Sequence, residues 1–235
     1  MSLLSDKYTV ATFDRRQMSA SLPLNGGPNK IWNPVQQARD IIAVITALGF
    51  EKASVFASSG GCTNALQLAF SYRTYITHLI LHEPPVYTLL DPDEATRNIE
   101  WAYEVMEKYQ KHGVETAMEM VLEILVGYDD GVPRAQPERW NQVNQLENET
   151  PWMAIYVPDL VTVKKHLEEE GRSVTVAYGT KSLDAVYVRT AKKLAERLEC
   201  AFVEFPGHHQ GFECEPGAFE PVLREVLEGG RKGKV

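Results

Sequence analysis

The sequence has few of the features that mark secreted, membrane or nucleic-acid-binding proteins. Its three cysteines, scattered among 235 residues, predict no disulfide framework and favour a reducing compartment. The net charge of -8 argues against binding to a phosphate backbone. No apolar run approaches the roughly 20 residues that cross a bilayer, and the first residues lack the apolar core of a signal peptide. We therefore expect a cytoplasmic protein that binds neither nucleic acid nor membrane.

Sequence motifs for phosphates, dinucleotides and metals are missing as well. Neither G-x-x-x-x-G-K-[ST] nor G-x-G-x-x-G occurs, and no Cys/His spacing resembles a zinc site. We expect no metal and no organic cofactor. What is present is an ordinary globular composition, 44% hydrophobic and 24% charged, which is enough to bury a substantial core.

Strand-like and helix-like patterns alternate at both ends of the chain. We expect strands and helices in the following ranges: strands 8–13, 53–57, 76–82, 173–179 and 201–205; helices 34–48, 184–198 and 216–227. This alternation predicts an α/β fold with a mostly parallel sheet and helices on both faces. Between 86 and 171 helical periodicity replaces the β-rich runs. We expect a core of residues 1–85 and 172–235, with 86–171 as a helical cap over the carboxyl edge of the sheet.

A turn of small residues joins one β-rich run to the helix that follows it. In a strand–turn–helix elbow, the residues two before and two after the nucleophile must be small. For Ser59 these are Ala57 and Gly61, whereas for Ser58 one of them is Phe56. Ser59 is therefore the better candidate nucleophile. The turn alone also fits a simpler interpretation, in which it is merely glycine-rich and its serines cap the helix.

Two adjacent histidines follow the last expected strand. A serine hydroxyl becomes nucleophilic when a base takes its proton, and a carboxylate orients that base and stabilises its charge. The chain order Ser, acid, His is the one found on α/β sheets with a nucleophile elbow. His208 and His209 both stand where such a base belongs. The alternative is a pair of solvated loop histidines.

In the order of these segments the chain resembles the α/β-hydrolase superfamily over most of its length. The matching segments are the loop Asp14-Arg15-Arg16, the elbow, the turn Glu83-Pro84-Pro85, and the loop Pro206-Gly207-x-His209-x-Gly211-Phe212. In those relatives the catalytic histidine precedes a proline by seven residues, as His209 precedes Pro216. The resemblance therefore implies His209 as the base, with His208 as the alternative.

Two carboxylates compete for the role of the acid. Most of the superfamily places it after the strand that here ends at Gly179, where Asp184 is available. A minority, including hydrolases similar to the fungal zearalenone lactonases, carries a glutamate after the strand that follows the elbow helix. Glu83 occupies that position. The resemblance favours Glu83, and Asp184, which also suits the first turn of a helix, is the alternative acid.

The chain departs from the superfamily at its start. Relatives have strands before the position of Tyr8, and the last of them ends in a turn that supplies one oxyanion donor. This chain begins after that turn, which leaves the backbone N–H of Gly60 as the expected donor. Losing one donor typically costs on the order of 10²–10³ in rate. The expected fold is therefore N-terminally short, and an uncovered sheet edge near 8–13 predicts association, most simply as a homodimer.

The resemblance implies a serine hydrolase that cleaves an ester, lactone or similar acyl bond of a small, mostly apolar molecule. In this interpretation Ser59 attacks, His209 transfers the proton, Glu83 orients His209, and Gly60 N–H supports the oxyanion. The alternative is a non-catalytic relative that binds a ligand or a partner, because half of the oxyanion hole is missing.

An aromatic and methionine-rich cap over a parallel sheet predicts where the small-molecule substrate binds. Ligand sites in such folds lie at the carboxyl edge of the sheet. We expect a largely apolar pocket between cap and sheet with Ser59 at its floor. The resemblance implies Trp152 as a lining residue, because a similar aromatic-proline segment lines the site in the lactonase-like relatives, and Ser58 is the second residue expected to line the pocket.

Overall fold

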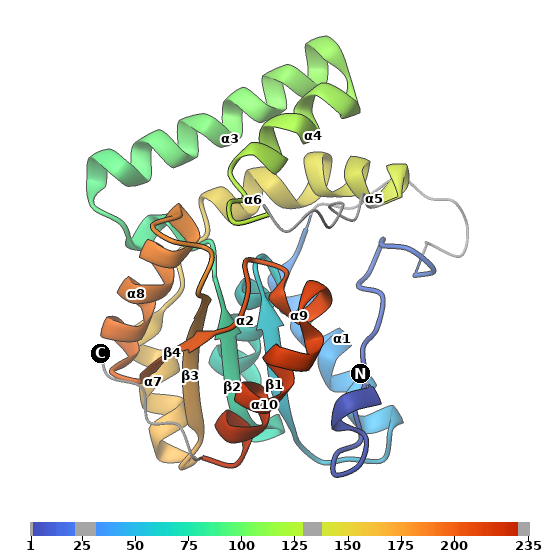
Figure 1. Cartoon of the computed structure of the whole chain (residues 1–235), viewed down its shortest axis with the longest axis vertical. Helices are drawn as coiled ribbons and strands as arrows, with labels where there is room; N and C mark the ends of the chain where they lie inside the picture. Colours follow the sequence, from blue (N-terminus) through green and yellow to red (C-terminus); the bar gives the residue numbers. More distant parts are fainter. Residues whose placement is uncertain (1, 22–31, 129–137, 230–235) are drawn as a thin grey trace.

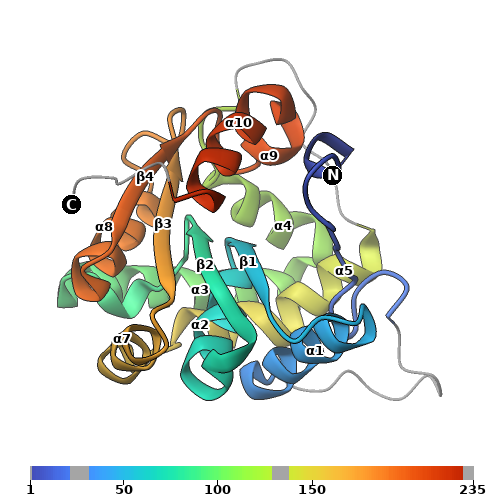
Figure 2. The same ribbon diagram turned by 90° about the horizontal axis from the view of Figure 1, so that it is seen from below.

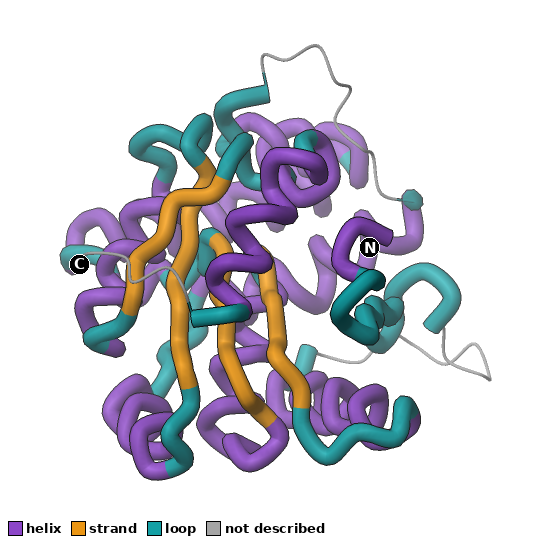
Figure 3. The backbone as a smooth tube through the Cα atoms, turned by 60° about the horizontal axis from the view of Figure 1, so that its bottom comes forward, coloured by secondary structure: helices purple, strands orange, loops and turns teal. Residues whose placement is uncertain are grey.

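The computed structural model describes residues 2–21, 32–128 and 138–229. At its centre lies a parallel sheet of four strands in the order β1 (Ala53–Ser58), β2 (Ile76–His82), β3 (Ser173–Gly179) and β4 (Ala201–Phe205). The register pairs Ser58 with His82, and His82 with Ala177. The carboxyl ends of the strands therefore meet at one edge, as Figure 1 shows, and Figure 3 shows the four strands side by side. Four of the five expected strands, those after residue 50, are thus confirmed.

Helices cover both faces of the sheet. On one face lie α1 (Pro34–Ala47), α2 (Gly61–Tyr72), α7 (Leu160–Glu169) and α8 (Val186–Leu198), and on the other lies α10 (Pro216–Leu227), as Figure 2 shows. Along β2, Leu79 and Leu81 belong to the first core, whereas Ile80 between them packs with Phe219 of α10. Such two-sided burial is what makes a parallel strand almost continuously apolar.

A group of helical segments lies beyond the carboxyl edge of the sheet (Figure 1). It contains α3 (Pro92–His112), α4 (Val114–Glu123), α5 (Arg139–Asn144), a π-helical turn η4 (Gln145–Glu149) and α6 (Thr150–Ala154). These segments have a small core of their own around Val105, Ala117 and Leu146. Single turns complete the described elements: η1 (Ser2–Leu4), η2 (Arg73–Tyr75), η3 (Tyr87–Leu89) and α9 (Gly211–Cys214).

Helix α7 falls within the range expected for the cap, yet it lies beside the sheet. Its Val163 and Leu167 are buried in the same core as Leu66 of α2 and Leu194 of α8. The division of the chain into a core of 1–85 and 172–235 and a cap of 86–171 stays a prediction. No helix in the described ranges is both long and apolar enough to span a bilayer.

The strand expected at 8–13 is not formed, and that expectation is wrong. These residues have no regular secondary structure and pair with none of the four strands. The segment before them is fixed to α10, because Arg224 donates to the carbonyl of Leu3 and to Asp6, and its guanidinium lies 5.9 Å from the ring centre of Tyr8. The β-forming residue types of 8–13 favour a strand only where the segment can pack against a neighbouring strand, so residue type alone does not determine a strand here. Strand β1 is thus an edge of the described sheet, and the expected homodimer stays a prediction.

Candidate active site

Ser59 sits in a strained turn between β1 and α2. Its φ of 52° is left-handed, a conformation that costs a non-glycine residue about 1–3 kcal/mol and gathers at functional sites. The turn is held by its N–H, which donates to the carbonyl of His82 at 2.9 Å. Behind it, a side chain at Gly61 would meet the Cβ of Ala57 at 4.0 Å, so the two flanking positions face each other at close range. This is the geometry that small flanks predict for a nucleophile elbow.

Glu83 and His209 are joined by a short hydrogen bond. Glu83 directly follows β2, is fully buried and has a left-handed φ of 51°. Its Oε2 accepts from His209 Nδ1 at 2.6 Å, and its Oε1 accepts from the N–H of Gly179 at 2.7 Å. Burial would raise the pKa of Glu83, but the opposing influence, chiefly the hydrogen bond from His209, outweighs it, so the pKa lies below its ordinary value. An ionised Glu83 places the ring proton on Nδ1 and leaves Nε2 free to act as a base.

Ser59 and His209 line the same cavity, which has a volume of about 150 Å³. No hydrogen bond between their side chains is found within the described part of the chain. The rest of the lining is mainly apolar and comes from Gly60, Pro85, Tyr87, Trp101, Ala102, Val121, Ile124, Leu125, Met153, Ala154 and Tyr187, with Gln145 and Thr150 as polar members. Gly60 N–H makes no hydrogen bond to other described residues, so it is available to a substrate oxygen.

The two alternative site residues lie elsewhere. The side chain of Asp184 is 89% exposed and lies 3.4 Å from Arg189. His208 is buried, stacks on Tyr128 with ring centres 3.7 Å apart, and accepts through Nδ1 from the N–H of Gln210. The structure therefore brings Glu83, and not Asp184, to His209, and it gives His208 a packing environment outside the cavity lining.

Two expected lining residues are placed away from the cavity, and both expectations are wrong. Trp152 is 41% exposed, because the next residues of α6, Met153 and Ala154, are the ones that face the cavity. Its expected place is taken by Trp101 of α3. Ser58 precedes the elbow, and its Oγ lies 3.3 Å from His82 Nδ1, away from the cavity lining.

Sequence reasoning missed several side chains that line the cavity, among them Tyr187 and Gln145. The ring of Tyr187 lies 4.6 Å from that of His209, and Gln145 enters the cavity from the π-helical turn. In this turn Thr150 N–H donates to the carbonyl of Gln145, one residue further back than in an α-helix. The following residue, Pro151, has no N–H to donate, and it is the one sequence signal that could have indicated an irregular turn.

His82 is a buried histidine directly before Glu83. Its ring is surrounded by aromatic side chains, including Phe205 and Phe219, and lies 6.4 Å from the ring of His209. Burial lowers its pKa to about 4, with His209 adding to the effect and Glu83 opposing it. His82 is therefore neutral at physiological pH.

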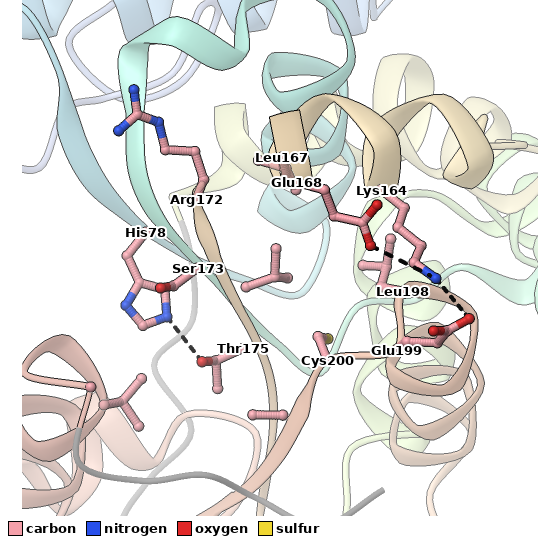
Figure 4. A pocket seen from close by; sticks show the side chains of 14 residues that line it. His78, Lys164, Leu167, Glu168, Arg172, Ser173, Thr175, Leu198, Glu199 and Cys200 are labelled. Carbon is pink, nitrogen blue, oxygen red and sulfur yellow. Dashed lines mark hydrogen bonds and ion pairs between the residues drawn. The ribbon is translucent and has the colours of Figure 1, made fainter. Parts of the chain in front are cut away.

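A larger cavity of about 500 Å³ lies at the opposite end of the sheet (Figure 4). It opens beside the first residues of β3 and β4, where His78 Nε2 is 2.9 Å from Thr175 Oγ1 and Lys164 pairs with Glu199. Its lining contains neither Ser59 nor His209. Because reactive groups of parallel α/β sheets gather at the carboxyl ends of the strands, the smaller cavity is the better candidate active site. The described residues contain no group of three or more His, Cys, Asp or Glu side chains that could hold a metal ion.

Solved structures with the same architecture identify the fold. The chain is similar to a thermophilic esterase from Thermogutta terrifontis, with a TM-score of 0.65 and 20% identity over 92% of this chain and 78% of that one. It is similar to an enol-lactonase from Burkholderia xenovorans, with a TM-score of 0.65 and 17% identity over 97% and 84% of the two chains. The chain thus has the α/β-hydrolase fold, as the sequence resemblance implies.

Among curated proteins, the chain is similar to the uncharacterized hydrolase YraK of Bacillus subtilis. The two are 27% identical over 230 residues, which cover 97% of this chain and 82% of that protein. No protein-family model matches the chain.

Proposed function

We propose that this protein is a serine hydrolase that cleaves an ester, lactone or similar acyl bond of a small, mostly apolar molecule. The observation that carries the proposal is the 2.6 Å hydrogen bond between Glu83 and His209 at the wall of a cavity that Ser59 shares. Ser59, Glu83 and His209 follow the ends of β1, β2 and β4, and this chain order of serine, acid and histidine is the one used on such sheets. The esterase and lactonase names of two structural neighbours and the hydrolase name of YraK support the reaction class.

The proposed reaction has two steps. Ser59 Oγ attacks the carbonyl carbon while His209 Nε2 takes its proton, and the carbonyl oxygen, now negative, accepts from Gly60 N–H. The C–O bond then breaks, and His209 returns the proton to the departing alcohol oxygen. In the second step water attacks the acyl-serine with His209 again as the base, which releases the acid and restores Ser59. Glu83 holds the ring of His209 and stabilises its positive charge throughout.

The lining of the cavity supports a small and mostly apolar substrate. Its volume lies well below the range of about 300–1,000 Å³ typical of pockets for drug-sized ligands. Besides Ser59 and His209, Gln145 and Thr150 bring polar side chains to it, and a few convergent polar groups in an apolar site fix the orientation of a ligand.

The test is hydrolysis of short p-nitrophenyl esters and simple lactones by the wild-type chain and by two neighbouring serine variants. We expect Ser59→Ala to lose activity by on the order of 10⁴-fold or more, since the nucleophile is removed. Ser58→Ala, one residue earlier and outside the cavity lining, is expected to keep most of it. A wild-type chain that hydrolyses nothing, yet binds small apolar ligands saturably, would instead support the non-catalytic alternative.

A further inference from the structure

Met153 of α6 lies directly against the residue that follows Ser59. A Cβ atom placed on Gly60 would come within 2.6 Å of Met153 Sδ and 3.2 Å of its Cε. The thioether therefore occupies the space that any side chain at position 60 would take. Both residues line the 150 Å³ cavity, so the end of Met153 forms the part of its wall next to the expected oxyanion donor.

The proposed reaction decides which part of the substrate would meet this wall. The departing oxygen must face His209, which gives it a proton, and the ring of His209 is bordered by Tyr187. The carbonyl oxygen must face Gly60 N–H. The remaining substituent of the carbonyl carbon is the acyl chain, which must use the part of the lining that faces neither His209 nor Tyr187. Met153, which lies against Gly60, belongs to that part of the lining.

We propose that Met153 is a specificity-determining residue that restricts this protein to short acyl groups; the inference rests on the proposed function. A methionine is unbranched and fills irregular apolar space closely. Its Cγ, Sδ and Cε atoms stand where a longer acyl chain would extend. Removing them opens the cavity on the acyl side while leaving Ser59, His209 and Glu83 in place.

The test uses p-nitrophenyl esters from acetate to octanoate. The measured quantity is the ratio of kcat/KM for hexanoate to kcat/KM for acetate. One methylene in an apolar pocket is worth about 10–200-fold in such discrimination, so we expect Met153→Ala to raise the ratio by at least about tenfold. Met153→Leu, which keeps a side chain of similar volume, should leave the ratio near the wild-type value.

Trp152→Ala is the matched control, because Trp152 belongs to the same helix and is 41% exposed outside the cavity lining. It should not change the ratio. If Met153→Ala does not fold, as judged by circular dichroism and thermal melting, Met153→Val removes the same sulfur and methyl group with a smaller loss of packing.

Two results would overturn the inference while leaving the proposed function intact. In one, the wild-type chain hydrolyses the esters but Met153→Ala and Trp152→Ala show the same ratio. In the other, Met153→Ala changes the preference among acetates of different alcohols and not among different acyl chains. Failure of the proposed function is distinguishable from both results, because the wild-type chain would then hydrolyse no ester and Ser59 would react with no serine-directed probe. That outcome would overturn the inference about Met153 as well.

Discussion

Replacing Glu83 by glutamine changes one atom of the buried hydrogen-bonded pair and should almost abolish hydrolysis. Both oxygens of Glu83 accept hydrogen bonds, one from His209 Nδ1 and one from Gly179 N–H. A glutamine offers one oxygen and one NH₂ group, so it can satisfy only one of these two donors. The remaining donor then faces the NH₂ group of the glutamine, also a donor, in a fully buried position.

The two orientations of the introduced amide have different consequences. With its oxygen toward Gly179, its NH₂ donates to His209 Nδ1 and forces the ring proton onto Nε2, the atom that must accept the proton of Ser59. With its oxygen toward His209, the N–H of Gly179 is left unsatisfied, which costs about 1–3 kcal/mol. The first orientation avoids that cost and gives His209 the wrong tautomer.

We therefore expect Glu83→Gln to lower kcat/KM by on the order of 10³–10⁴-fold, or about 4–5.5 kcal/mol, as loss of the carboxylate does in Ser-His-Asp triads. The assay is steady-state hydrolysis of a p-nitrophenyl ester, with circular dichroism and thermal melting to verify folding. Asp184→Asn is the matched control. Because its carboxylate is 89% exposed, we expect an effect within about twofold. A folded Glu83→Gln variant with near-normal activity, or an inactive Asp184→Asn variant, would refute the reasoning.

Three further predictions concern stability and association. His82 has a pKa of about 4 in the folded protein against an ordinary 6.5, so the unfolded chain binds more protons between these pH values. About 3 kcal/mol of stability should therefore be lost as the pH falls from 6.5 to 4. Urea titrations should show that the free energy of unfolding of His82→Leu depends less on pH than that of the wild type. Arg15 pairs with the buried Glu149 at 2.6 and 3.1 Å. Arg15→Leu should cost about 3 kcal/mol of stability, the low end for breaking a buried pair, and the double variant Arg15→Leu/Glu149→Leu should regain much of that stability. A double variant as unstable as Arg15→Leu would contradict this. The edge strand β1 has one described neighbour, and light scattering over a concentration series should detect a dimer, with a clean monomer at high concentration as the contrary result.

The elements that sequence predicted best are those whose pattern repeats locally. Strands β1 to β4 are short apolar runs bounded by turn residues, and their alternation with helices leaves few topologies for a parallel sheet. The elbow was predictable because its constraint is local: Ser59 requires small residues at 57 and 61. The pairing of Glu83 with His209 spans 126 positions, and its prediction depended on resemblance as well as on strand ends meeting at one edge.

The elements that sequence predicted wrongly are those decided by tertiary contacts. The segment 8–13 has the residue types of a strand, yet its neighbourhood is set by contacts of Arg224 with the residues before it. Trp152 was expected in the cavity because a similar aromatic-proline segment lines the site in the lactonase-like relatives, but the direction of its side chain depends on the helical phase after the π-helical turn. A change of one residue in that phase rotates a side chain by about 100°. Sequence periodicity cannot fix the phase across such an irregular turn.

The most direct test of the account is the site of reaction with a serine-directed fluorophosphonate. The chain is incubated with the probe, digested, and analysed by mass spectrometry for the modified serine. The strained φ of Ser59 and its shared cavity with His209 predict a single adduct on Ser59, absent in Ser59→Ala and strongly slowed in Glu83→Gln. An unmodified wild-type chain, or an adduct on Ser58 in place of Ser59, would contradict the central claim.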